Sequence, residues 1–188
     1  MKKICAVVIT ITLAFLINAY AKSTEQVTPV LKSSATETGA EVRWYNFNEG
    51  IKQAIARHRP ILIDFYADWC VWCKKMEAEV FTEAQVARKL KDSFICIRIV
   101  LDKDPKETIK YKNHTLLKRE FLDMLGIQHI PTVVFMDKDT NLITKFPGYI
   151  RKDIFLHLLG YIGEECYEKK ISFNEYMEGK IPCSKTKK

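Results

Sequence analysis

Two cysteines, Cys70 and Cys73, are separated only by Val71 and Trp72. If this segment is helical, residues three apart lie one turn apart on the same face, so the two sulfur atoms can meet. A thiolate at one position can attack a disulfide in another molecule, and the second thiol can then attack the mixed disulfide. The spacing therefore indicates thiol–disulfide exchange, with Cys70 as the nucleophile and Cys73 as the resolving thiol.

The residues around the pair predict a strand before it and a helix after it. Residues 61–66 are apolar on both faces except for Asp64, which is typical of a central strand. A helical pattern follows the pair, with a break expected near Thr82. Cys70 then lies at the helix start, where unpaired N–H groups and the helix dipole stabilise a thiolate. Its pKa should lie below the free value of about 8.5.

Two carboxylates near the pair are candidates for proton transfer. Asp64 is the lone charge of the apolar strand, six residues before Cys70. Burial should raise its pKa and let it carry a proton to or from Cys73; the alternative is a structural or partly exposed carboxylate at a strand end. Glu77 lies one helical turn beyond Cys73 and can share that task, unless it is an ordinary exposed helix glutamate.

The rest of the chain alternates strands and helices and shows no internal repeat. Further strands are expected at residues 42–47, 94–101, 132–136 and 142–146. Further helices are expected at residues 48–57, 104–126 (which residues 112–114 can split), 151–161 and after Ser172, which forms a capping box with Glu175. This order predicts a three-layer α/β/α fold with a central mixed sheet and a short extra C-terminal helix.

The N-terminus has the pattern of a cleaved export signal. Lys2 and Lys3 precede an uncharged, mainly apolar stretch at residues 4–17, and Ala19-Tyr20-Ala21 places small residues at the cleavage positions. An uncleaved membrane anchor is the alternative, although the apolar stretch is short for a bilayer. We therefore expect a periplasmic or otherwise exported protein. The predicted parts are a signal peptide (1–21), a flexible linker (22–40), one domain (41–165) and a C-terminal helical tail (166–188).

The remaining cysteines have structural interpretations. Export permits disulfides, and the odd number of cysteines after residue 21 leaves at least one without a partner in the chain. Cys166 and Cys183 flank the tail helix and form either a structural disulfide or two free thiols. Cys96 alternates with Phe94 in an apolar strand and is expected to be a buried, inert thiol.

The segment Ile63-Asp-Phe-Tyr-Ala-Asp-Trp-Cys-Val-Trp-Cys-Lys74 resembles the active-site segment of the thioredoxin superfamily. Ile130-Pro131-Thr132 is similar to the cis-proline loop of that family, and Gly148 to its late glycine. The resemblance covers about residues 42–162 and implies a thioredoxin-like fold. Within the superfamily, the Cys segment with Glu77 is similar to the C-terminal periplasmic domain of the membrane reductase DsbD, which suggests a free-standing relative of that domain.

The resemblance also implies a substrate-binding surface. Pro131 is expected to follow a cis bond, to face the cysteines and, with Ile130, to offer backbone groups to a substrate chain; an ordinary trans proline is the alternative. Trp69 and Trp72 are expected to form an apolar docking rim, with core packing as the alternative for Trp69. Trp72 replaces the proline of thioredoxins and the histidine of isomerases, so the resemblance leaves the redox potential open.

These features together predict an exported thiol–disulfide oxidoreductase, working as a reductant of protein disulfides or of the disulfide formed by apocytochrome c thiols. Its electrons are expected from a membrane donor of the DsbD or CcdA type. A disulfide oxidant or isomerase and a copper-handling binding protein are the alternatives. We expect a monomer without cofactor or resident metal. The net charge of +7 comes largely from scattered lysines, without a nucleic-acid-binding motif, so we expect no nucleic acid partner.

Overall fold

The computed structural model describes residues 41–179 and Cys183. The predicted signal peptide (1–21) and linker (22–40) lie outside these residues, as do residues 180–182 and 184–188 of the predicted tail. Within the described part of the chain, no helix is long and apolar enough to cross a lipid bilayer.

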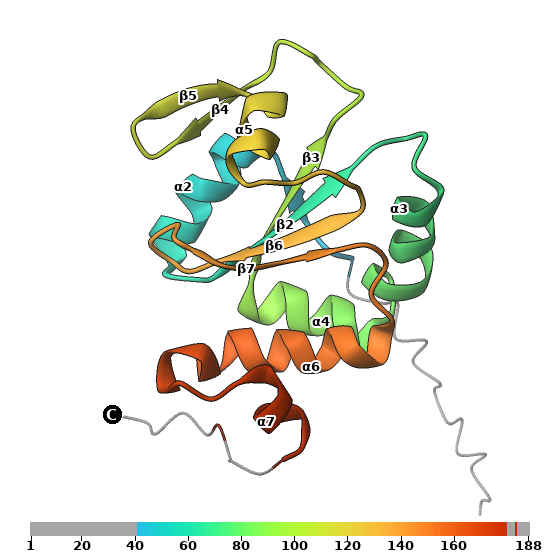
Figure 1. The fold of residues 1–188 in the computed structure, drawn as a ribbon, viewed down its shortest axis with the longest axis vertical. Helices are drawn as coiled ribbons and strands as arrows, with labels where there is room; N and C mark the ends of the chain where they lie inside the picture. The colour runs from blue at the N-terminus through green and yellow to red at the C-terminus, as the bar shows by residue number, and fades with distance from the viewer. Residues whose placement is uncertain (1–40, 180–182, 184–188) are drawn as a thin grey trace, which may run out of the picture. The chain divides into compact units, whose positions relative to one another are not determined.

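Among the described residues, a five-stranded mixed sheet forms the centre of the domain (Figure 1). Its strands are β1 (Trp44–Tyr45), β2 (Ile61–Tyr66), β3 (Ile95–Val100), β6 (Thr132–Met136) and β7 (Leu142–Pro147), in the order β1-β3-β2-β6-β7. β3 is parallel to β1 and β2, whereas β6 is antiparallel to β2 and β7. The strand before the Cys pair is therefore central, as predicted.

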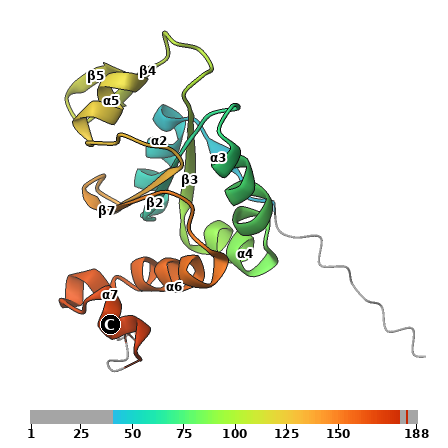
Figure 2. The ribbon, with the colours of Figure 1, turned by 45° about the vertical axis from the view of Figure 1, so that its right-hand side comes forward.

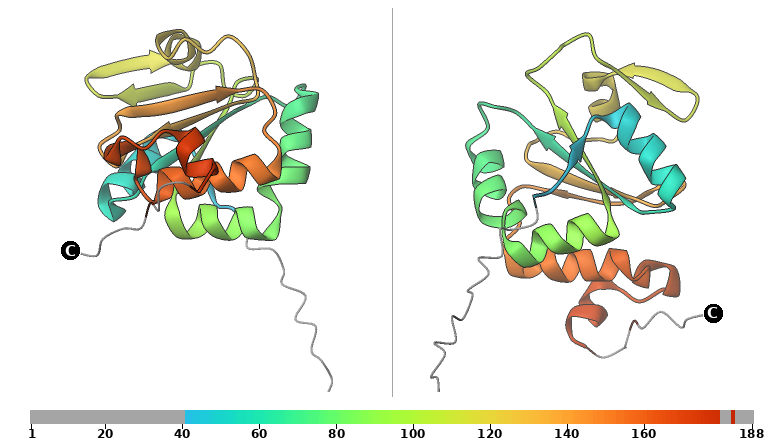
Figure 3. Two further views of the ribbon diagram at one scale, coloured as in Figure 1. Left: turned by 60° about the horizontal axis from the view of Figure 1, so that its bottom comes forward. Right: turned by 180° about the vertical axis from the view of Figure 1, so that it is seen from behind.

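Different helices cover the two faces of the sheet, because side chains alternate along each strand. Ile61, Ile63 and Phe65 of β2 pack on one face, and Leu62 packs on the other. The first face is covered by α2 (Phe47–Arg57) and α5 (Lys118–Met124). The second face is covered by α3 (Val71–Met76), the π-helical turn η1 (Glu77–Phe81), α4 (Ala84–Ser93) and α6 (Lys152–Gly163). α4 and α6 lie side by side (Figures 1 and 3). The predicted three-layer α/β/α architecture is confirmed.

The long helix predicted over residues 104–126 is wrong in its first half. Residues 108–117 form a β-hairpin of β4 (Thr108–Tyr111) and β5 (His114–Leu117), and only α5 is helical. The reason is a two-residue period: Ile109 and Tyr111 are buried, and their neighbours are exposed. Lys112 turns the chain in the left-handed region (φ 53°), where a split had been expected. The hairpin lies against α5 (Figure 2).

The first helix begins at Phe47, one residue before the predicted start at residue 48. Asn46 is its cap, since its side chain accepts the N–H of Glu49 at 2.9 Å. Asn48 bonds the hairpin: its Nδ2 donates to the carbonyl of Thr108, and its Oδ1 accepts the N–H of Lys110, both at 2.8 Å. α2 therefore holds the hairpin on the same face of the sheet.

The C-terminal tail packs against α6. A 3₁₀ turn, η2 (Cys166–Lys169), leads to α7 (Phe173–Met177), which begins with the predicted capping box of Ser172 and Glu175. Cys166 and Cys183 are both buried and are joined by a disulfide with a Cα–Cα distance of 5.7 Å. Of the two possibilities left open by the sequence, the structure has the disulfide.

Candidate active site

Cys70 and Cys73 form a disulfide at the start of α3, with a Cα–Cα distance of 5.2 Å. Cys70 is the cap residue of this helix, and its Sγ accepts the backbone N–H of Cys73 at 3.1 Å. Both side chains are buried. A helix N–H directed at the Cys70 sulfur stabilises negative charge on that atom, which is the requirement for a reactive thiolate.

The pair is surrounded by exposed apolar side chains. Trp69 is 69% exposed, Val71 74% and Trp72 55%, so Trp69 does not belong to the core. The ring of Trp72 lies 5.8 Å from that of Tyr149, and the Lys75 ammonium lies 5.1 Å from the Trp72 ring centre. A buried disulfide within an exposed apolar rim is suited to contact with another protein.

The loop before β6 faces the pair from the other side. The Ile130–Pro131 peptide bond is cis, as predicted, and Ile130 packs against the cluster that contains Cys70 and Cys73. The Pro131 carbonyl accepts the N–H of Gly148 at 2.7 Å. Gly148 has φ 86°, a conformation that side chains other than hydrogen strongly disfavour. This glycine therefore permits the contact that anchors the loop.

Asp64 is buried on the sheet face that α3 and η1 cover, and it is paired with Arg98 of β3. The two residues are register partners, and Arg98 Nε donates to Asp64 Oδ2 at 2.8 Å. The other end of the guanidinium pairs with the Glu77 carboxylate, which is half-buried one turn beyond Cys73. The two carboxylates expected near Cys73 are thus linked by one cation.

Burial raises the pKa of Asp64 from 3.8 to about 6. The charge and hydrogen bond of Arg98 lower the Asp64 pKa, and the Glu77 charge raises it, but the burial effect is larger. The Arg98 guanidinium also contacts aromatic rings, 4.0 Å from the Trp44 ring centre and 5.1 Å from that of Tyr66. At neutral pH Asp64 is mainly a carboxylate that can still accept a proton.

Sequence reasoning missed Arg98. The signal was available, because Arg98 is the single charge of the apolar strand Ile95–Val100, just as Asp64 is the single charge of β2. Cys96, expected to be inert, is buried and unpaired, and burial raises the pKa of its thiol to about 12. His129 is exposed in the loop that leads to the cis-proline.

A cysteine pair at a helix start, opposite a cis-proline loop and beside a buried carboxyl, defines a thiol–disulfide oxidoreductase of the thioredoxin fold. The sequence model of the thioredoxin-like domain matches residues 47–163. Since this is more than half of the chain, the protein belongs to the thioredoxin-like family.

Relatives named thiol:disulfide interchange protein DsbD also match this chain. The one from Yersinia enterocolitica is 35% identical over 108 residues, which is 56% of this chain and 17% of the relative. The one from Ralstonia nicotianae is 34% identical over 110 residues, 58% of this chain and 16% of the relative. The match therefore spans about a sixth of the length of these relatives, and it confirms the predicted similarity to DsbD.

Solved structures show the same fold. A thioredoxin from Thermus thermophilus has a TM-score of 0.56 at 22% identity and covers 69% of this chain and 95% of its own. A thioredoxin-fold protein from Helicobacter pylori has a TM-score of 0.54 at 20% identity, covering 65% of this chain and 80% of its own. These likenesses concern the fold alone, and they agree with the predicted class.

Proposed function

We propose that the protein is an exported reductant of disulfides in other proteins. The Cys70 thiolate attacks a client disulfide and forms a mixed disulfide, with one client sulfur leaving as a thiolate. The Cys73 thiolate then attacks Cys70 Sγ, which releases the second client thiol and leaves the Cys70–Cys73 disulfide. The observation that carries this proposal is the N–H of Cys73 donated to the Cys70 sulfur at the start of α3.

Asp64 is the proposed proton acceptor for Cys73 during the second attack. It lies on the sheet face covered by the helix that carries Cys73, and its raised pKa of about 6 suits a base near neutral pH. Glu77 is proposed to share this task through Arg98, which contacts both carboxylates. Trp69, Trp72, Ile130 and Pro131 are proposed to bind the client chain around its cysteine.

Export is proposed from the pattern of residues 1–21 and is supported by the buried Cys166–Cys183 disulfide, because such bonds persist in oxidising compartments. Clients are then secreted proteins with mispaired disulfides or apocytochrome c. A monomer and a membrane electron donor of the DsbD or CcdA type complete the proposal. Mass spectrometry of the exported protein tests the first step, since cleavage after Ala21 gives a mature chain that begins at Lys22.

The catalytic proposal is tested by turnover of a model protein disulfide with wild type, Cys70→Ser and, as a matched control, Cys96→Ser. Turnover should disappear in Cys70→Ser and persist in Cys96→Ser; turnover by Cys70→Ser would overturn the proposal. Titration of the pair in thiol buffers tests the direction of electron flow. A reduction potential of about −270 mV supports a reductant, whereas one of about −120 mV makes the protein a disulfide donor.

Copper handling by the pair has less support from the geometry. Among the described residues, one group of three potential metal donors lies close together, and it consists of Glu164, Cys166 and Cys183. That group is remote in sequence from Cys70 and contains two sulfurs already joined to each other. A copper titration with a spectroscopic readout separates the two functions.

A further inference from the structure

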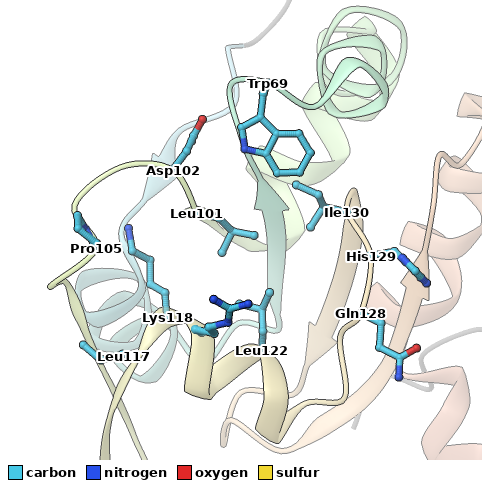
Figure 4. Close-up of a pocket in the computed structure, with 11 residues that line it drawn as sticks. Trp69, Leu101, Asp102, Pro105, Leu117, Lys118, Leu122, Gln128, His129 and Ile130 are labelled. Carbon is cyan, nitrogen blue, oxygen red and sulfur yellow. The ribbon is translucent and has the colours of Figure 1, made fainter.

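A cavity of about 810 Å³ opens beside the Cys pair. Four chain segments line it: Trp69, the loop after β3, the beginning of α5 with the residue before it, and the cis-proline loop (Figure 4). Clefts that hold drug-sized ligands measure about 300–1,000 Å³. The cavity therefore has room for several side chains of a bound polypeptide.

The cavity and the Cys pair share a wall. Leu101 and Ile130 pack against the cluster of Ala67, Cys70 and Cys73, and both also line the cavity. Figure 4 shows these two side chains between Trp69 on one side and Leu122 on the other. Side chains that flank a client cysteine would therefore reach the cavity while that cysteine is bonded to Cys70.

Two of the charged groups that line the cavity are already engaged. Lys118 is buried, and its ammonium donates to the carbonyls of Val100 and Lys103 and pairs with Glu107 at 2.9 Å. These contacts use all three of its donors. The Asp102 carboxylate accepts the backbone N–H of Asp68 at 2.8 Å. Both groups therefore fix the loops that form the cavity.

Arg119 lines the cavity next to Lys118 and is exposed. Within the described residues it makes no hydrogen bond or ion pair, so its charge is not used by the fold. An exposed guanidinium in the wall of a cavity that also has apolar side chains is complementary to a carboxylate carried by an apolar segment. Leu117, which is 43% exposed, adds an apolar wall on the same side.

We propose that this cavity selects clients whose cysteine is flanked by an apolar residue and then an acidic one. The apolar side chain packs on Leu101 and Ile130, in the part of the cavity flanked by Trp69 and Leu122, and the carboxylate pairs with Arg119. This inference rests on the proposed function and specifies its substrate class. The cavity is a specificity site, because it touches the client and not the reacting sulfurs.

The test uses symmetric peptide disulfides with blocked ends. The three peptides have the sequences Glu-Leu-Cys-Leu-Glu (the Leu-Glu peptide), Lys-Leu-Cys-Leu-Lys (the Leu-Lys peptide) and Glu-Gly-Cys-Gly-Glu (the Gly-Glu peptide). The second-order rate constant for reduction by the reduced protein is measured by stopped flow. Each value is divided by that for dithiothreitol with the same peptide, which removes differences in intrinsic reactivity. A small uncharged disulfide, bis(2-hydroxyethyl) disulfide, reports the basal reaction.

The Leu-Glu peptide should react about fivefold faster than the Leu-Lys peptide and about tenfold faster than the Gly-Glu peptide. Arg119→Glu should reverse the charge preference and leave the basal reaction unchanged. Lys52→Glu, the same change of charge at an exposed position of α2, should alter neither. Leu117→Ser should weaken the preference for Leu, because it removes one of the apolar side chains that line the cavity. It should keep the stability, because serine is a good helix cap and Leu117 is the cap residue of α5.

Each failure has its own pattern. If wild type reduces the small disulfide but treats the three peptides alike, the specificity site is wrong and the proposed function stands. The specificity site is also wrong if Lys52→Glu has the effect of Arg119→Glu. If wild type reduces none of the disulfides, the proposed function is wrong, and the specificity site falls with it.

Discussion

The charge of Asp64 should destabilise the folded protein at neutral pH. Its pKa is raised from 3.8 to about 6, chiefly by burial. One pKa unit corresponds to about 1.4 kcal/mol, so a difference of roughly two units corresponds to about 3 kcal/mol. Asp64→Asn removes the charge but keeps the shape and an oxygen that can accept from Arg98 Nε. The variant should therefore be about 3 kcal/mol more stable than wild type at pH 8.

The pH dependence follows from the protons bound in each state. Between pH 3.8 and about 6 the unfolded chain has lost the Asp64 proton while the folded protein still binds it. Stability contributed by this group is present below pH 3.8 and is lost as the pH rises through about 6. The difference in the free energy of unfolding between Asp64→Asn and wild type should be near zero at pH 3.5 and reach its full value above pH 7.

Urea unfolding of both oxidised proteins, at intervals from pH 3.5 to 8, measures this difference. Titrating groups that do not interact with Asp64 contribute equally to both proteins and cancel, whereas the interaction with Glu77 remains part of the measured difference. Asp92→Asn is the matched control, because it makes the same replacement at an exposed position of α4. The reasoning is refuted if the difference in the free energy of unfolding between Asp64→Asn and wild type does not change with pH, or if wild type is the more stable protein at pH 8.

Other contacts predict measurable stabilities and reactivities. Arg98→Met leaves the Asp64 carboxylate buried without its cation and should lower the free energy of unfolding at pH 7 by about 3 kcal/mol. The double variant Arg98→Met/Asp64→Asn should recover most of that loss. If the double variant is as unstable as Arg98→Met, the pairing of Arg98 with Asp64 is contradicted. Cys166→Ser/Cys183→Ser opens a loop with a sequence separation of 17 and should cost about 3 kcal/mol in urea unfolding while turnover of a model disulfide is kept. Burial and the raised pKa of Cys96 predict that iodoacetamide labels it only in urea, as read by mass spectrometry; equal labelling of the native protein would show that the thiol is accessible.

The sequence predicts the sheet well because its strands carry strong local signals. β2 and β6 have the bounds expected from their apolar runs, since buried strands need apolar residues on both faces. The hairpin at residues 108–117 was not predicted, because its residues also fit a helical period and only two of them, Ile109 and Tyr111, contact the core deeply. In such a segment tertiary packing decides between the two periods, and the local pattern of the segment does not show which one that packing favours.

The site was predictable in its parts but not in its connections. Cys70, Cys73 and the loop at Pro131 are recognisable from spacing and motif. The link between Asp64 and Glu77 depends on the register of β2 against β3, which places Arg98 opposite Asp64. Register is a property of two strands together, so neither strand alone indicates it. The cavity that includes Arg119 likewise depends on the hairpin that the sequence did not predict.

A carboxyl group whose charge costs the fold about 3 kcal/mol is better explained by chemistry than by stability. If Asp64 accepts the proton of Cys73, its loss should slow the second attack and spare the first. With a symmetric chromogenic disulfide, the first thiolate released reports attack by Cys70 and the second reports resolution by Cys73. In Asp64→Asn the first phase should be unchanged, and the second should be slower by about 100-fold at pH 7 and lose its rise through pH 6. Equal second phases in the two proteins would assign Asp64 no part in proton transfer, and its buried charge would then be a cost of pairing with Arg98.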